Sequence, residues 1–175
     1  MATDSPAEQA RLTLDAPEAG VPFRSVGFTL STLGFAVSAG FAERLAPLGL
    51  EPRDFALLRS VGAAEGSSQQ AVGERLGIPP SRMVGFVDAL QGRGLLERRA
   101  HPSDRRARAL HLTPAGRALL AGAHEAAVAF ESELCAGLAP GERDRLLDLL
   151  GAVTETIGLR PGVHAANAAA APPGD

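Results

Sequence analysis

The segment from residue 67 to residue 112 constrains the fold of this chain more than any other part, because two short helical patterns are followed at once by two strand patterns. The first pattern predicts a short helix that runs through Leu76. Ser67 and Gln70 have the spacing of a capping box at its start, and Gly77 ends it.

A second helix is predicted after a tight turn. Pro79, Pro80 and Ser81 can open this helix, since proline is tolerated in the first helical turn. Gly92 and Gly94 end it. The side chains expected on its buried face are Met83, Phe86, Val87 and Leu90.

The spacing then changes to that of strands. Residues 95–100 and 107–112 are predicted to be two short strands, and the charged residues 101–106 join them. A short helix, a glycine turn, a second helix and a basic hairpin form a winged helix-turn-helix. The predicted fold class is therefore mainly α with a small β-wing.

Helices are also predicted on both sides of this segment. Apolar residues spaced three and four apart predict a helix over residues 26–45, which stops before Pro47, and a second helix follows Pro52. Thr113 and Pro114 predict the start of a long helix, and Pro140 is predicted to open the last one. Residues 1–22 and 159–175 lack a sustained period and are expected to be a flexible arm and a disordered tail.

The charge is distributed unevenly along the chain. The net charge is only −3, and all seventeen basic residues are arginine. Residues 75–117 nevertheless hold nine arginines against three acids, a local charge of +6. An isolated charge run of this kind is usually a solvated loop, but here it follows two helices spaced for DNA binding, so we interpret it as a nucleic-acid contact.

The second helix fits the major groove, which is about 12 Å wide, while the hairpin can reach phosphates or the minor groove. Arg82, near the start of that helix, can donate two hydrogen bonds to a guanine. Arg105 and Arg106 at the hairpin tip can enter a narrow minor groove, with Asp104 orienting one of them. The predicted DNA-binding residues are Ser68, Gln69, Ser81, Arg82, Met83, Arg98, Asp104, Arg105, Arg106 and Arg108.

Five motifs carry a resemblance to a known family. They are Leu76-Gly77-Ile78-Pro79-Pro80-Ser81, Val87-Asp88-Ala89-Leu90, Arg93-Gly94-Leu95-Leu96-Glu97-Arg98, Pro102-Ser103-Asp104-Arg105-Arg106 and Leu110-His111-Leu112-Thr113-Pro114-Ala115-Gly116. Together they resemble the MarR family of bacterial transcription regulators, over residues 23–158. The resemblance implies a homodimer that binds a pseudo-palindromic operator in double-stranded DNA.

The resemblance also implies how the chain is divided. Residues 23–47 and 114–158 would form the helical dimerisation region, and residues 48–113 the winged helix-turn-helix. Family members usually repress, and many release DNA when a small aromatic or anionic effector binds. This chain departs from the family in the middle of the second helix, where Val84 and Gly85 replace a common Thr-Arg pair, so we expect base reading to move one turn earlier, to Arg82.

Small residues share one face of the first helix, at positions 27, 31, 34, 38 and 42. This face either lets another helix approach closely or leaves space for a ligand beside the phenylalanines. For a ligand site of this kind, apolar with a few polar groups, the predicted residues are Arg24, Phe28, Ser31, Phe35, Phe55 and Arg59.

Other functions have less support in the sequence. The four histidines fall in no metal-binding motif, there is no phosphate-binding loop and no nucleophile elbow, so we expect no enzyme, no metal and no cofactor. No run of apolar residues is long enough for a membrane span, no secretion signal is present, and the single cysteine cannot form an internal disulfide, which indicates a cytoplasmic protein. Two alternatives remain open: a winged-helix module that binds protein, and a redox regulator that uses Cys135.

Overall fold

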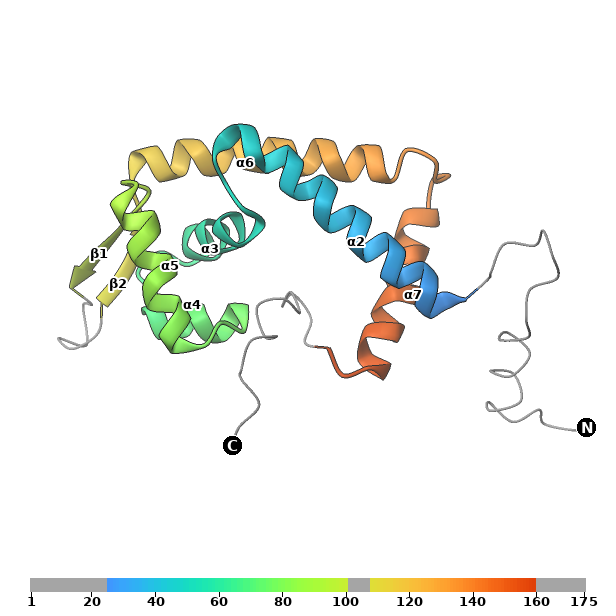
Figure 1. Cartoon of the computed structure of the whole chain (residues 1–175), viewed down its shortest axis with the longest axis horizontal. Coiled ribbons are helices and arrows are strands. Elements are labelled where there is room, and N and C mark those ends of the chain that lie inside the picture. The colour runs from blue at the N-terminus through green and yellow to red at the C-terminus, as the bar shows by residue number, and fades with distance from the viewer. Residues whose placement is uncertain (1–24, 101–107, 160–175) are drawn as a thin grey trace, which may run out of the picture. The chain divides into compact units, whose positions relative to one another are not determined.

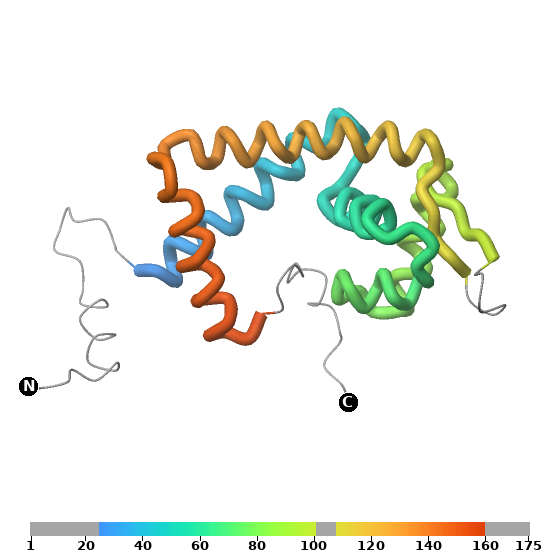
Figure 2. Tube along the Cα trace, turned by 180° about the vertical axis from the view of Figure 1, so that it is seen from behind, coloured from blue at the N-terminus to red at the C-terminus, as the bar shows by residue number. Residues whose placement is uncertain are grey.

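The computed structural model describes residues 25–100 and 108–159 (Figures 1 and 2), and the chain forms two compact units, residues 1–41 and 42–175. The elements in chain order are α2 (Val26–Leu45), the 3-10 turn η1 (Ala46–Leu48), α3 (Pro52–Ala63), α4 (Gln69–Leu76), α5 (Pro80–Gly92), β1 (Leu96–Ala100), β2 (Arg108–Leu112), α6 (Pro114–Leu134) and α7 (Glu142–Thr156). The predicted class, mainly α with a small β-wing, is confirmed.

Helix α4 begins one residue later than the capping pattern predicted. Its N-cap is Ser68, whose hydroxyl accepts a hydrogen bond from the Ala71 N–H at 3.1 Å. The Ser67 carbonyl instead accepts a hydrogen bond from the Leu110 N–H, so the backbone of Ser67 is held against β2. The predicted capping box of Ser67 and Gln70 is therefore wrong, and helix α4 ends at Gly77 as predicted, with φ of 66°.

The wing is a two-stranded antiparallel sheet. Leu96 pairs with Leu112 and Ala100 with Arg108, and an isolated bridge joins Ser68 to Ala109 on the other edge of β2. The strands agree with the predicted segments within a residue where they are described, and residues 101–107, which join them, lie outside the described residues. Strand β2 is thus bonded to the start of α4 as well as to β1.

Helix α6 starts where Thr113 and Pro114 predicted. The Thr113 hydroxyl accepts from the Gly116 N–H at 3.0 Å and donates to the Gly94 carbonyl at 2.6 Å. Gly116 is buried so close to the residue before β1 that a Cβ atom there would overlap the Leu95 carbonyl oxygen. The first turn of α6 therefore packs directly on the backbone between α5 and β1.

The last helix starts later than predicted. Pro140 stands before α7 rather than in its first turn, because Gly141 adopts a left-handed conformation with φ of 84° as the N-cap. The carboxylate of Glu142 accepts a hydrogen bond from the Ala139 N–H across this turn. The turn thus separates α6 from α7.

Helix α2 has the predicted bounds, and its apolar residues are largely exposed. Phe28 is 58% exposed and Phe35 is 81% exposed. By length and composition alone, the stretch Val26–Leu48 is long and apolar enough to cross a membrane. No other helix of the described residues meets this criterion. The sequence prediction required an uninterrupted apolar run, and Glu43 and Arg44 interrupt this one.

The core of the second unit lies between α3, α4, α5, α6 and the wing. Helix α3 packs on α4, β2 and α6, as Figure 1 shows. The largest fully buried side chains are Leu45, Leu57, Leu58, Val61, Val72, Met83, Val87, Leu90, Leu96 and Leu110. Helix α5 and the wing therefore pack on the same core.

Replacing Gly116 with alanine should destabilise the protein by about 1–3 kcal/mol, because the added Cβ overlaps the Leu95 carbonyl. Helix propensity alone would favour alanine by about 1 kcal/mol. Gly122→Ala is the matched control on the same helix, since a Cβ there meets no atom within 4 Å, and it should leave stability unchanged or raised. Urea unfolding of both variants measures the difference, and equal midpoints would disprove the tight packing.

Glu65 connects the wing to α6, and its contribution should depend on pH. Its carboxylate accepts hydrogen bonds from the Arg117 guanidinium and the Leu112 N–H, and the Arg117 bond is the main reason that the pKa of Glu65 lies below its usual value. A lowered pKa in the folded state adds stability at neutral pH that is lost as the pH falls through that pKa.

Glu65→Gln should therefore lower the free energy of unfolding by about 0.5–1 kcal/mol at pH 7, and the difference from wild type should shrink below about pH 4. Unfolding curves measured between pH 3 and pH 7 test this. Glu155→Gln, which removes an exposed carboxylate on α7, is the control. A difference that stayed constant over this range would contradict the ionic role of Glu65.

Candidate nucleic-acid interface and adjoining pocket

Helix α5 has one face in the core and one face in solvent. Met83, Val87 and Leu90 are buried. The exposed row contains Ser81, Val84, Gly85 and Asp88, which are spaced as one face of a helix. Because α5 is the second helix of the helix-turn-helix, this row is the surface available to a major groove.

The predicted contacts on α5 divide along the same line. Ser81 is exposed at the start of the helix and Arg82 is partly buried beside it. Met83 is only 1% exposed, so the prediction that it contacts DNA is wrong. The apolar spacing of α5 also predicts Met83 on the buried face of the helix, and that prediction is confirmed.

Arg98 on β1 is bound by other protein groups. Its guanidinium forms an ion pair with Asp88 at 2.7 Å and donates to the side-chain oxygens of Gln91 at 2.6 Å and Gln69 at 3.1 Å. These contacts connect the wing to both α4 and α5. The structure therefore shows Arg98 and Gln69 positioning the wing, and their predicted DNA contacts stay predictions.

The remaining predicted DNA contacts are at the edges of the module. Ser68 is the N-cap of α4, and Arg108 is exposed at the first position of β2. Asp104, Arg105 and Arg106 lie outside the described residues.

A second polar cluster fixes the far end of α5. Arg93 donates to the Gly49 carbonyl at 2.7 Å and lies 3.3 Å from the Asp54 carboxylate. Arg53, next to Asp54 on α3, lies over the ring of Phe86 at 4.9 Å. Sequence reasoning did not identify this cluster, because its members come from three separate segments.

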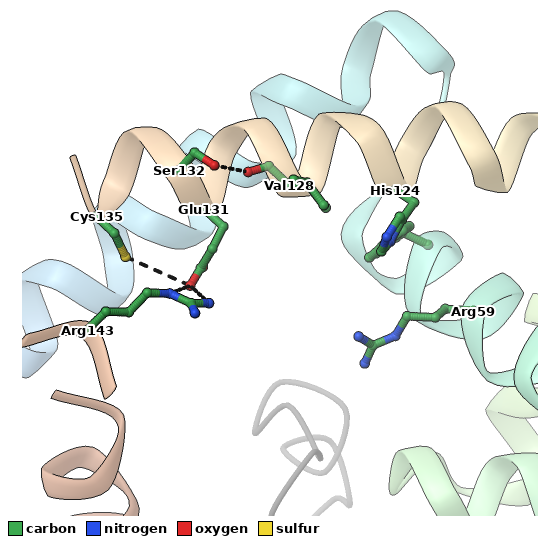
Figure 3. A pocket seen from close by; sticks show the side chains of 9 residues that line it. Arg59, His124, Val128, Glu131, Ser132, Cys135 and Arg143 are labelled. Carbon is green, nitrogen blue, oxygen red and sulfur yellow. Dashed lines mark hydrogen bonds and ion pairs between the residues drawn. The ribbon is translucent and has the colours of Figure 1, made fainter. Parts of the chain in front are cut away.

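A pocket of about 690 Å³ opens beside this module, between α3, α6 and the start of α7 (Figure 3). Phe55 and Arg59 come from α3, and Arg143 from α7. The residues contributed by or following α6 are His124, Ala127, Val128, Glu131, Ser132 and Cys135. The lining combines apolar side chains with a few polar groups, as small-molecule sites do.

The cations of the pocket have different surroundings. Arg143 donates to Glu131 at 2.9 Å, and this bond raises the pKa of the Arg143 guanidinium. Arg59 lies 6.0 Å over the ring of Phe55, and Figure 3 shows its guanidinium on the opposite side from Arg143. Cys135 lies 3.9 Å from the carboxylate of Glu131.

The predicted ligand residues are thus divided. Phe55 and Arg59 line the pocket. Phe28, Ser31 and Phe35 belong to the part of α2 in the first unit, and Arg24 lies outside the described residues. His124, Ser132 and Arg143 were missed, because the sequence did not show which face of α6 meets α3. Within the described residues, no group of three or more acidic, histidine or cysteine side chains could hold a metal ion.

Comparisons with known proteins agree with this geometry. The family model for the MarR family matches residues 48–107. A structure of the transcriptional repressor CouR bound to a 23-mer DNA duplex is 35% identical, with a TM-score of 0.70, and the match covers 79% of this chain and 99% of that one. A MarR-family transcriptional regulator from Rhodococcus sp. RHA1 is 30% identical, with a TM-score of 0.64, over 77% and 96% of the two chains.

Curated relatives extend the match. The HTH-type transcriptional repressor Rv2887 of Mycobacterium tuberculosis is 30% identical over 129 residues, which are 72% of this chain and 93% of that protein. The relatives are regulators of transcription rather than enzymes. The chain therefore belongs to the MarR family of winged helix-turn-helix transcription regulators.

Proposed function

We propose that this protein is a cytoplasmic homodimeric repressor that binds a pseudo-palindromic operator and releases it when an aromatic or anionic effector binds. The observation that carries the DNA-binding part is the rigid module of α4, α5 and the wing, which leaves the face of α5 with Ser81 and Val84 exposed. A solved DNA complex of the similar repressor CouR supports it.

The dimer would form through residues 23–47 and 114–158. Large apolar side chains of these regions are exposed in the single chain, and exposed apolar patches of this kind usually mark interfaces. They are Val26, Phe28, Leu33, Phe35, Val128, Leu134, Leu138, Leu146, Leu147, Leu149 and Ile157. A dimer explains why α2 is apolar enough to resemble a membrane span. Two modules related by a two-fold axis then require two half-sites.

The effector would bind in the pocket between α3 and α6. A second structure of CouR, from Rhodococcus jostii RHA1, has p-coumaroyl-CoA bound and is 30% identical over 83% of this chain and 100% of that one, with a TM-score of 0.67. A ring stacked near Phe55, with its anionic group toward Arg59, suits the chemistry of the lining. Such a ligand weakens DNA binding a hundredfold only if it prefers the non-DNA conformation by about 2.7 kcal/mol.

Operator binding should be specific and strongly dependent on salt, because neutralising phosphates releases counterions. Arg82→Ala should cost about 1–3 kcal/mol and relax preference at one base position, whereas Arg108→Ala should weaken binding with less change in preference. Gel-shift titrations on the protein's own upstream region, at two salt concentrations, test both. Equal affinity for a scrambled duplex at physiological salt would refute specific reading.

Arg59→Met should weaken binding of aromatic acids and aryl-CoA thioesters about tenfold or more, since it removes the cation and keeps the aliphatic part of the side chain. Arg145→Met is the control. Arg145, on α7, is exposed like Arg59 on α3, but it does not line the pocket. Calorimetry with a panel of these compounds measures the difference. Unchanged affinity in a folded Arg59→Met dimer would place the effector site elsewhere.

A further inference from the structure

We propose that Val84 recognises the C5-methyl group of a thymine in each operator half-site, and that Gly85 lets the backbone of α5 come close to the base edges there. This inference rests on the proposed operator binding. It assigns a base type to the one turn of α5 that differs from the Thr-Arg pair expected there.

Val84 occupies the centre of the exposed row of α5. It is 47% exposed, while Met83 before it and Val87 one turn later are buried. Within α5, all of which is described, no other large apolar side chain is exposed to this extent. An exposed valine alone would need no explanation, but this one lies on the surface that the fold offers to the major groove.

The polar side chains nearest to Val84 in this exposed row are either paired with another residue or almost one turn away. They therefore supply no hydrogen bond to a base edge at this turn. Asp88, one turn later in the same row, is paired with Arg98 at 2.7 Å. Ser81 lies almost one turn earlier, and Gly85 has no side chain. The central turn therefore presents an isopropyl group and bare backbone.

Thymine is the base that such a surface can distinguish. Its C5-methyl group is the apolar substituent of the major groove edge that the other bases lack. A contact between the valine methyls and the thymine methyl removes both from water, and burial of one such group changes a binding constant by about fourfold. The contact carries no charge, so its contribution should not depend on salt.

Gly85 adds a steric condition. A Cβ built on Gly85 meets no atom of the protein within 4 Å, so the space beside it is open in the free chain. Alanine would be favoured there by helix propensity. If DNA fills this space, the same substitution must reduce affinity for DNA while it stabilises the free protein.

The test uses the full-length protein and an operator selected from random duplexes. Each thymine of one half-site, and its symmetry mate, is replaced by deoxyuridine, which lacks only the methyl group. For wild type we expect one thymine pair at which the replacement weakens binding about tenfold or more, since two methyls are lost from the dimer site. Val84→Ala should bind the thymine and uracil duplexes at that position with nearly equal affinity.

The outcomes separate this inference from the proposed function. Binding of wild type to scrambled and selected duplexes alike would refute operator reading itself. Specific binding without a sensitive thymine, or a uracil effect that persists in Val84→Ala, would overturn the role of Val84 while leaving the repressor function in place. Loss of the uracil effect in Val84→Ala alone supports it.

Gly85→Ala and Gly92→Ala form a matched pair for the second part. Both glycines are in α5, and neither would bring a Cβ within 4 Å of another atom. Both variants should unfold at or above the wild-type midpoint. Only Gly85→Ala should lose affinity for the selected operator, about tenfold or more, and equal affinities of the two variants would exclude close approach at Gly85.

Discussion

The contact between the first turn of α6 and the backbone of Leu95 determines how the rest of this protein can act. Gly116 permits it, because any side chain at that position would overlap the Leu95 carbonyl. Thr113 strengthens it through bonds to Gly94 and Gly116. The end of α5, the start of β1 and the start of α6 thus meet at one point. The first turn of α6 thus contacts the backbone that connects the recognition helix to the wing.

Arginine has two roles in this chain, which contains no lysine. The basic segment suggested a uniformly DNA-facing charge, yet Arg93, Arg98, Arg99 and Arg117 each pair with a carboxylate in the described structure. The guanidinium group suits this use, because its planar donors can satisfy several acceptors at once. Local net charge therefore overstates the number of cations that can neutralise phosphates, and the position of each arginine decides its role.

The sequence predicted the elements well because their signals are local. Thr113 and Pro114, and glycine at position 77, act on their own turns of the backbone. The error at the start of α4 has a non-local cause, because the N-cap is Ser68 where the backbone of Ser67 bonds to β2. The DNA contact predicted for Met83 is wrong for a local reason, since the apolar spacing of α5 itself places this side chain on the buried face. The lining of the pocket was predicted only in part. Phe55 and Arg59 were predicted, but the lining residues on α6 depend on how α6 packs on α3.

Helix α6 also joins the two sites of the proposed repressor. Its first turn holds Leu95, and its second half, from His124 to Ser132, lines the pocket. Arg44 at the end of α2 donates to Glu133 on α6, and this bond lowers the pKa of the Glu133 carboxyl. An effector in the proposed pocket between α3 and α6 would therefore act on the helix that supports the wing at one end and bonds to the end of α2 at the other. In the proposed dimer, such an effector would change the spacing of the two recognition helices without touching either one, provided that it binds the two conformations with different affinity.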